Sequence, residues 1–385
     1  MTGSIRRFAA GPILVLTLIA VSACSSPEPP LIGVAPQATD VPGAIPIQAT
    51  AGAAALPAPA TASPAPPTAT PASSPAATFD PKFCPLTGLP FAGIDWTQRR
   101  AVLVPIGNSP PERPQSELAL ADIVFEHLTE GGITRFSAVY LCRDAHNIGP
   151  VRSARLINLY NVPMMNAVFA FSGASDGALA RVLSSELKQA MLYSDAGDPG
   201  FKRAGERKPP FNLHASTDAI WSAARERGWA PGARYTVLPF GDAPDSGSPA
   251  VQIALPFGHG VSDVSYTYDP SVGAYVRSMG GFPHNDVSTG APLAAANVLI
   301  IFAPHTETDI VEDSLGSRSI FIDLSAGGRA ILLRDGQAYE GMWSLPDAHA
   351  FFELKDASGR PMLFKPGTTW IEVAPPDMAI VISEQ

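Results

Sequence analysis

Two glutamates and three arginines occur close together in the sequence, around an expected hairpin and the segment that follows it. They are Glu126, Glu130, Arg135, Arg152 and Arg155. Guanidinium groups bind carboxylates and phosphates through paired hydrogen bonds, and carboxylates can hold guanidinium groups in position. The pattern therefore predicts an anion-binding pocket. The same residues could instead form an ion-pair network that only ties these segments together.

Further polar residues could complete such a pocket. Ser153 lies between two of the arginines, and Asn212 and His214 precede an expected helix. A histidine in this position could transfer a proton or contact a ligand. It could equally well be a structural residue bonded to a backbone carbonyl. We expect Ser153, Asn212 and His214 at the ligand site.

The pocket depends on a hairpin and a helix. Two β-rich runs, Asp122–Thr129 and Arg135–Cys142, flank a Glu-Gly-Gly turn, where glycine permits the positive φ angles of a tight connection. A helix is expected over Ser153–Asn166. Arg152 and Arg155 would then share a face at its start, where free backbone N–H groups also attract anions.

The remaining pattern predicts two folded parts. In the first, strands at Arg100–Ile106 and Val168–Phe171 alternate with helices at Asp176–Gln189 and Asp218–Arg227. This is typical of an α/β (or α+β) domain with a mixed sheet. The second part consists almost entirely of short strand patterns with turn signals, such as Asp335-Gly336, between them. We expect a smaller, mostly antiparallel β domain there.

Composition sets the expected boundaries. Residues 1–24 combine a positive start, an apolar run and a small-residue cleavage site, which is typical of a secretory signal. Residues 25–80 are rich in proline and alanine, and this composition predicts a disordered tether. The α/β domain would cover 81–241, a linker 242–250 and the β domain 251–385.

The cysteines predict a lipid anchor and a disulfide. Val-Ser-Ala-Cys ends the apolar run and resembles a bacterial lipobox, so Cys24 would carry acyl chains, such as palmitate, that attach the protein to a membrane. The protein would be extracytoplasmic, on the cell membrane or on an outer membrane if the envelope has one. In that oxidising compartment Cys84 and Cys142 would form a disulfide, and two buried free thiols are the alternative.

Several function classes are not expected. The formal net charge is -9, and no block of basic residues is present, so nucleic acid is not an expected partner. No Cys/His spacing indicates a zinc site, and no motif for ATP, nicotinamide or haem occurs. We therefore expect no metal and no cofactor.

Several longer motifs resemble the family of YerB-like lipoproteins, a two-part domain of unknown function. The resemblance covers roughly residues 83–375. The motifs that carry it are Cys84-Pro85-Leu86-Thr87-Gly88, Arg113-Pro114-Gln115-Ser116, Glu130-Gly131-Gly132-Ile133-Thr134-Arg135, Gly149-Pro150-Val151-Arg152-Ser153-Ala154-Arg155, Asn212-Leu213-His214, Pro283-His284-Asn285-Asp286 and Pro366-Gly367-Thr368-Thr369-Trp370. The resemblance implies an envelope lipoprotein without a defined activity.

The order of residue types also resembles the LytR-CpsA-Psr wall-polymer transferases. In that family, acidic residues and arginines hold a polyprenyl pyrophosphate and its magnesium. Asp122, Arg135, Arg152 and Arg155 would correspond, although the chain lacks that family's membrane helix and its Pro-Arg-Asp signature.

Three functions follow as hypotheses. The first is binding of an anionic wall or lipid-linked component through the arginines. The second is an envelope enzyme acting on phosphate or glycan bonds, with Glu126 or His214 as acid or base. The third is a scaffold whose β domain docks envelope proteins.

Overall fold

The computed structural model describes residues 80–91, 96–229, 236–258 and 260–384. The expected signal peptide, Cys24 and nearly all of the expected tether lie outside these residues. In the described part of the chain, none of the helices is both long and apolar enough to cross a membrane.

One large mixed sheet runs through the molecule. Its strand order is β19-β18-β17-β14-β20-β2-β3-β1-β4-β5, with β8 paired to β18. The N-terminal half contributes β1 (Val102–Gly107), β2 (Ile123–Leu128), β3 (Thr134–Tyr140), β4 (Val168–Phe171) and β5 (Met191–Tyr193). The C-terminal half contributes β8 (Ser248–Pro249), β14 (Asn297–Phe302), β17 (Gly328–Arg334), β18 (Gln337–Ser344), β19 (Glu353–Lys355) and β20 (Thr369–Ala374).

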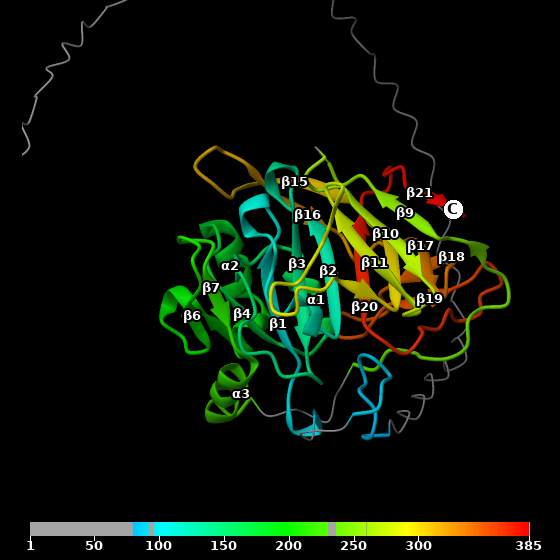
Figure 1. Ribbon diagram of the computed structural model, residues 1–385. Coiled ribbons are helices and arrows are strands. Elements are labelled where there is room, and N and C mark those ends of the chain that lie inside the picture. Colours follow the sequence, from blue (N-terminus) through cyan, green and yellow to red (C-terminus); the bar gives the residue numbers. More distant parts are fainter. Residues whose placement is uncertain (1–79, 92–95, 230–235, 259, 385) are drawn as a thin grey trace, which may run out of the picture. The chain divides into compact units, whose positions relative to one another are not determined.

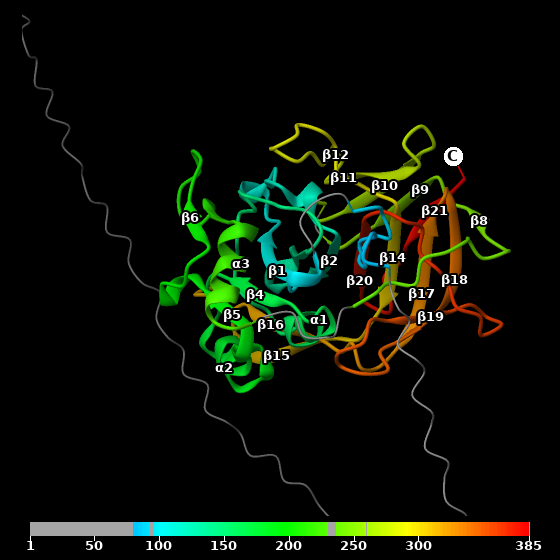
Figure 2. The same cartoon turned by 90° about the horizontal axis from the view of Figure 1, so that it is seen from below.

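Strands of the two halves meet at β20, which lies between β2 and β14 (Figures 1 and 2). It is parallel to both neighbours. Strands β1, β4 and β5 run in the same direction, and β3 is antiparallel to β1 and β2. The carboxyl ends of the parallel strands therefore meet at one edge of the sheet, which we call the carboxyl edge.

A second sheet packs against one face of the large sheet. Its order is β12-β11-β10-β9-β21, with β13 paired to β11, and all of its pairings are antiparallel. It contains β9 (Gln252–Leu255), β10 (Val264–Asp269), β11 (Ala274–Met279), β12 (Phe282–Pro283), β13 (Ala294–Ala295) and β21 (Val381–Ser383). Two short ribbons, β6 (Phe201–Arg203) with β7 (Leu213–Ala215) and β15 (His305–Val311) with β16 (Arg318–Ile322), complete the strands.

Helices cover the large sheet around its N-terminal strands. Helix α3 (Thr217–Glu226) packs on the same face as the second sheet, beside β1 and β4. Helices α1 (Asn158–Met164) and α2 (Asp176–Ser184) pack on the opposite face, and Ser175 caps α2 through its hydroxyl group. The expected fold class is confirmed: an α/β N-terminal part precedes a mostly antiparallel β part. The domain boundary at 242–250 stays a prediction, since strands from both sides of it share one sheet.

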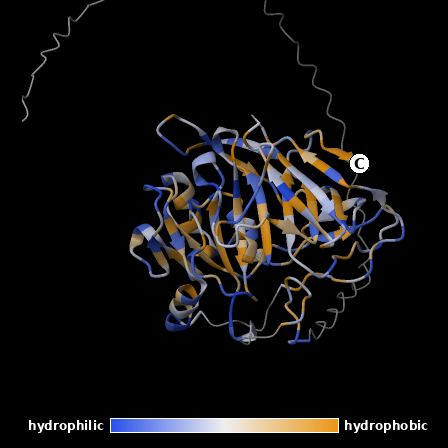
Figure 3. Cartoon of the chain, in the orientation of Figure 1, coloured by the Kyte–Doolittle hydropathy of each residue, from blue (hydrophilic) through white to orange (hydrophobic). Residues whose placement is uncertain are grey.

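Burial explains the strand patterns. Every residue of β1, β3 and β14 is buried, which agrees with their nearly continuous apolar sequences. Strand β11 alternates between buried and half-buried residues because only one of its faces meets the core. Figure 3 shows hydrophobic residues concentrated in the strands, whereas the outer loops contain many hydrophilic ones.

The helix expected over Ser153–Asn166 begins later than predicted, at Asn158. The backbone N–H of Arg152 donates to Pro105 in β1, and that of Ala154 donates to Gly173 after β4. These bonds hold the segment extended between two strand ends, so it cannot turn into a helix. Arg152 and Arg155 therefore do not lie on one helical face.

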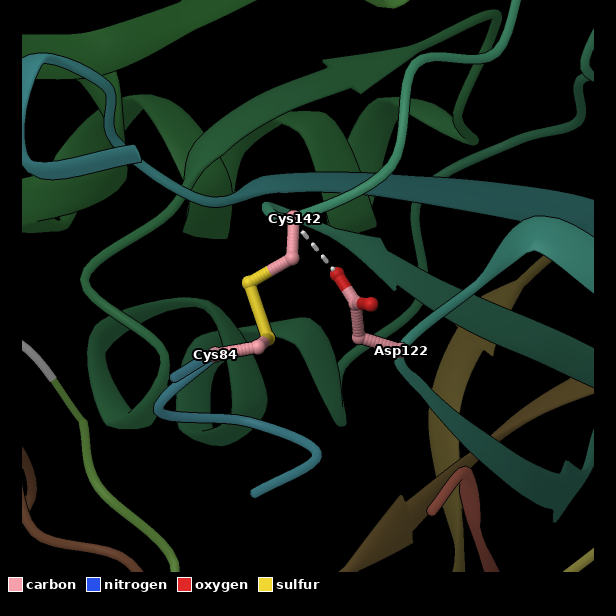
Figure 4. Close-up of side chains that lie close together, drawn as sticks. All are labelled: Cys84, Asp122 and Cys142. Atoms are coloured by element: carbon pink, nitrogen blue, oxygen red, sulfur yellow. Dashed lines mark hydrogen bonds between the residues drawn. A yellow bond between two sulfur atoms is a disulfide. The ribbon is translucent and has the colours of Figure 1, made fainter. Parts of the chain in front are cut away.

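The disulfide between Cys84 and Cys142 joins the start of the described chain to the end of β3 (Figure 4). Buried Asp122 lies beside it and accepts hydrogen bonds from the N–H groups of Leu141 (2.7 Å) and Cys142 (2.9 Å). Burial raises the pKa of the Asp122 carboxyl group, against the charge of Arg143. The two sulfurs and this carboxylate lie within 4.8 Å of one another. Disulfide sulfurs lack the thiolate that ligates metals, so this cluster is structural.

Reduction of this disulfide should lower the free energy of unfolding by about 4 kcal/mol, because the bond closes a loop between cysteines 58 residues apart. Urea unfolding with and without a phosphine reductant measures the change. A Cys84→Ser/Cys142→Ser double variant should match the reduced protein and be insensitive to reductant. Equal stability of the oxidised and reduced wild-type protein would contradict this role.

Candidate functional site at the carboxyl edge

A cluster of charged side chains lies at the carboxyl edge of the large sheet. We call it the carboxyl-edge cluster; its members are Glu112, Glu130, Arg135, Arg152, Ser153, Arg155 and Glu312. Glu112 follows β1, Glu130 follows β2, and Arg135 is the second residue of β3. The extended segment between β1 and β4 supplies Arg152, Ser153 and Arg155. Open sheets of parallel strands commonly bind ligands at this edge.

Arg155 is held by two carboxylates. Its Nε donates to Glu130 Oε2 at 2.7 Å, and its Nη2 donates to the other Glu130 oxygen. Glu312 Oε2 lies 3.5 Å from Arg155 Nη1. Burial alone raises the pKa of Glu130, but hydrogen bonds and charge from Arg155 outweigh it and lower that pKa to about 2. Arg155 is therefore a neutralised, structural cation.

Arg152 forms an ion pair through its Nε atom. Its Nε lies 2.7 Å from Glu112 Oε1, and its side chain is 23% exposed. The backbone N–H and the hydroxyl group of Ser109 both donate to Glu112 Oε2, at 2.7 and 2.6 Å. The Arg152 guanidinium also lies over the Phe211 ring, 5.6 Å from its centre. Its two Nη groups donate no hydrogen bond to any residue the structure describes, so they can bind a ligand.

Arg135 is buried without a matching carboxylate. It is 2% exposed, and its Nη1 donates to the backbone oxygen of Ser153 at 3.3 Å. Its Nε has no hydrogen-bond partner, and none of the described carboxylates lies within ion-pair distance of it. Burial and the neighbouring Arg155 lower the pKa of Arg135 to about 9, so the group still carries its charge at pH 7. An anion beside it would give this buried guanidinium the direct anionic partner that it lacks among the described residues.

Ser153 adds a hydroxyl group to this site. It is half-buried, and a Cβ at Gly173 would lie 3.0 Å from its Oγ. Gly173 also has a φ of +77°, which favours glycine. The glycine therefore leaves the Ser153 hydroxyl group uncovered on that side.

Three of the expected site residues lie elsewhere. Glu126 points to the opposite face of the large sheet, because it alternates with His127 along β2. Asn212 accepts a hydrogen bond from Arg203 within the β6–β7 ribbon. His214 is buried and lies 3.2 Å from the backbone oxygen of Asn147, and burial lowers the pKa of its imidazole. None of the three contacts an arginine of the cluster.

Asp122 also lies apart from the arginines. It directly precedes the first residue of β2, whereas Arg135 pairs with His127 near the carboxyl end of that strand. The correspondence with the wall-polymer transferases therefore fails for this residue. Arg135, Arg152 and Arg155 are the three of that set that the structure brings together.

Glu112 and Glu312 were not predicted as site residues, although Glu112 contacts Arg152 and Glu312 contacts Arg155. Glu112 is hidden in the proline-rich turn after β1, and Glu312 is more than 150 residues from Arg155 in the sequence. Glu312 directly follows β15, and this strand brings it across to Arg155. Sequence spacing contains no signal for such a contact.

A second polar group lies between the two sheets. Asn108 Nδ2 donates to Glu126 Oε1 (3.2 Å), and Glu126 pairs with Arg277 Nη2. Arg277 Nη1 donates to His284 Nδ1 (2.6 Å), so Nε2 of that ring holds the proton and donates to Gln115 Oε1 (2.6 Å). Gln115 Nε2 donates to Asn108 Oδ1 at 3.0 Å, which closes the circuit. We call this closed circuit the interlayer ring.

The interlayer ring joins the two halves of the chain, and every member is at most 3% exposed. His284 and Asp286 are both buried, so the segment around them is not a surface turn. Arg277 also lies close to Glu372 of β20, whose register partner is Glu126. The ring fixes the docking of the second sheet on the first.

Comparisons with known proteins agree with this two-part organisation. Residues 86–230 match the N-terminal domain of DUF3048, a protein family of unknown function, and residues 253–371 match its C-terminal domain. The chain is similar to "Putative lipoprotein YerB" of Bacillus subtilis (strain 168), with 36% identity over 306 residues, 78% of this chain and 88% of the relative. The crystal structure of Bacillus subtilis YerB has the same fold, with a TM-score of 0.67, 33% identity, and coverage of 78% of this chain and 99% of that chain.

Proposed function

We propose that this chain, which belongs to the DUF3048 family, is an extracytoplasmic lipoprotein that binds an anionic group of an envelope component at the carboxyl-edge cluster. The lipoprotein part rests on the name of its relative and on the apolar run that ends at Cys24. The acyl chains would hold the protein at the membrane, and the proline-rich segment would separate the folded part from it.

The observation that carries the binding proposal is the state of Arg135. A buried guanidinium with an unsatisfied Nε and no ion pair to any described residue is costly unless a ligand supplies the missing charge. The neighbouring arginines have carboxylate partners, and Arg135 does not. The ion pairs of the cluster leave the Nε of Arg135 without a hydrogen-bond acceptor among the described residues.

The ligand would approach through Arg152 and Ser153, since Arg135 itself is almost inaccessible. The exposed Nη groups of Arg152 would form the paired hydrogen bonds that carboxylates and phosphates accept. The Ser153 hydroxyl group would donate one more. Arg135, behind them, would stabilise the bound charge at short range.

The test measures thermal unfolding of the mature chain, expressed from Ser25 so that it carries no lipid, with inorganic phosphate, pyrophosphate and a short polyprenyl phosphate. A ligand that binds only the native state raises the unfolding midpoint. Arg152→Gln should weaken binding of the active compound by roughly tenfold or more, because one charge-assisted pair is lost. Arg181→Gln removes an exposed arginine on α2 and serves as the control. Equal shifts in wild type and Arg152→Gln would contradict the proposal.

Glu312→Gln should strengthen anion binding by roughly threefold to tenfold, because the variant removes a buried carboxylate that shares Arg155 with the site. Among the described residues neither oxygen of Glu312 accepts a hydrogen bond, and Arg155 keeps its pair with Glu130 in the variant. Calorimetric titration of the same phosphate compound into both proteins measures the ratio of their affinities. A weaker affinity in the variant would mean that Glu312 supports the arginines instead of competing with the ligand.

The enzyme alternative loses one of its two candidate groups. Glu126 is fully buried and paired with Arg277, so its carboxylate cannot reach a substrate as acid or base. His214 is still available to the enzyme hypothesis, and the scaffold hypothesis depends on the C-terminal part. Turnover of the bound compound, abolished by His214→Gln, would favour the enzyme.

A further inference from the structure

A cavity of about 310 Å³ opens beside the interlayer ring. The turn after β1 and the β11–β12 hairpin form its walls. Its lining residues are Pro110, Arg113, Pro114, Met279, Phe282, Pro283, His284 and Asn285. It shares no residue with the carboxyl-edge cluster, so a ligand here would be a second ligand.

The walls are mainly apolar and preformed. Pro110, Pro114 and Pro283 have restricted backbone angles, so this part of the wall needs little ordering when a ligand binds. Met279 is buried and adapts its shape to a ligand, whereas Phe282 is 74% exposed at the rim. Phe282 thus extends the apolar lining of the cavity to its rim, where the apolar part of a ligand could be buried.

One cation faces this apolar space. Arg113 Nε donates to Asn108 Oδ1 at 3.0 Å, and its Nη2 donates to the Asn108 backbone oxygen at 2.5 Å. Both acceptors are neutral, and none of the described carboxylates forms an ion pair with Arg113. Its Nη1 has no partner among the described residues. The interlayer ring thus positions this guanidinium through neutral hydrogen-bond acceptors.

The other polar groups of the cavity set the charge that a ligand should carry. His284 is neutral in the ring, because its Nδ1 accepts from Arg277 and its Nε2 donates to Gln115. Burial and the charge of Arg277 lower the pKa of His284 far below its usual value. A single available cation matches a monoanion, whereas a phosphate dianion would keep one charge unpaired in an apolar site.

We propose that this cavity binds a small organic carboxylate with an apolar body, its carboxylate on Arg113 and its body against Met279 and Phe282. The size of the cavity suits one ring or two fused rings. Such an acid could be free or could be part of a larger molecule, and the shared chemistry is an apolar group next to one carboxylate.

The experiment compares two probes of the same shape, 2-naphthylacetate and its neutral amide, by calorimetric titration into the mature chain. Wild type should bind the acid roughly tenfold or more tightly than the amide, because only the acid forms a charge-assisted pair with Arg113. Arg113→Gln should remove this preference and keep the amide affinity unchanged. Phe282→Ala should weaken both probes by a similar factor, and Arg181→Gln should change neither.

Two results would overturn the proposal. One is an equal affinity of wild type for the acid and the amide, and the other is no saturable binding of either probe at millimolar concentration. Loss of acid binding in Arg152→Gln would place the acid at the carboxyl-edge cluster instead. If Arg113→Gln does not fold, the proposal is still tested by the acid and amide affinities of wild type and by the Phe282→Ala variant, whose substitution is at an exposed position.

Discussion

Arg277→Met should lower the free energy of unfolding by about 3–5 kcal/mol, the largest loss we expect from a single substitution in this protein. Arg277 is fully buried, and its guanidinium lies between Glu126, His284 and the hydroxyl group of Tyr266, which is 3.2 Å from Arg277 Nε. Removal of this cation leaves Glu126 buried without a counter-charge. Urea unfolding at pH 7 measures the difference.

Glu372→Gln is the matched control, and its stability should lie within about 1 kcal/mol of wild type. Burial and the charge of Glu126 raise the pKa of Glu372 well above its usual value, which favours the neutral carboxyl group. Glutamine replaces this neutral group with little change in shape. The hydroxyl group of Tyr266, 2.5 Å from Glu372 Oε1, keeps an acceptor.

A double-mutant cycle separates the ion pair from the packing. Glu126→Gln/Arg277→Met should be less destabilised than the sum of the two single variants, because the double variant contains no unpaired charge. Additive losses would show that the Glu126–Arg277 pair contributes no coupling energy. The interlayer ring would then stabilise the protein through packing and not through charge.

Acidification from pH 7 to pH 4.5 should destabilise the protein through His127 by about 3 kcal/mol. His127 is 1% exposed, and burial, together with the charge of Arg135, lowers its pKa to about 3. In the unfolded chain the same ring takes up a proton below about pH 6.5. The unfolded state therefore binds more protons between pH 6.5 and pH 3, and stability falls as the pH falls through this range.

His127→Gln isolates this effect. The variant should be less stable at pH 7, since glutamine replaces a packed ring, but its stability should fall less steeply between pH 6.5 and pH 4.5. Glu130 acts at lower pH, because its pKa falls from 4.5 to about 2 and its contribution is lost between those values. An unchanged slope in His127→Gln, measured by urea unfolding at four pH values, would contradict the role of His127.

Local patterns in the sequence predicted the strands well. Val168–Phe171 has the predicted bounds, because its apolar run is short and bounded by turn residues. The Glu-Gly-Gly turn has positive φ angles at Gly131 and Gly132, as expected. The helix after Gly149-Pro150 was placed too early, because the backbone bonds that hold Arg152 extended come from β1 and from the segment after β4.

The site was only partly predictable. Arg135, Arg152 and Arg155 come together because hairpin and strand-end geometry follow from nearby sequence. The partner of Glu126 could not be predicted, since Arg277 reaches it only after the second sheet has packed on the first. Alternation along β2 did indicate that Glu126 and His127 face opposite ways, but the sequence contains no measure of which face the arginines occupy.

The position of β20 has a consequence for how the protein is made. This strand is near the end of the sequence, yet it fills the middle of the large sheet between β2 and β14. Until β20 is available, β2 exposes an unpaired backbone edge, which can pair with another chain and aggregate. A nascent chain would therefore need protection by a chaperone or rapid completion of synthesis. Truncations that remove residues 369–374 should yield insoluble material in place of a smaller folded N-terminal part.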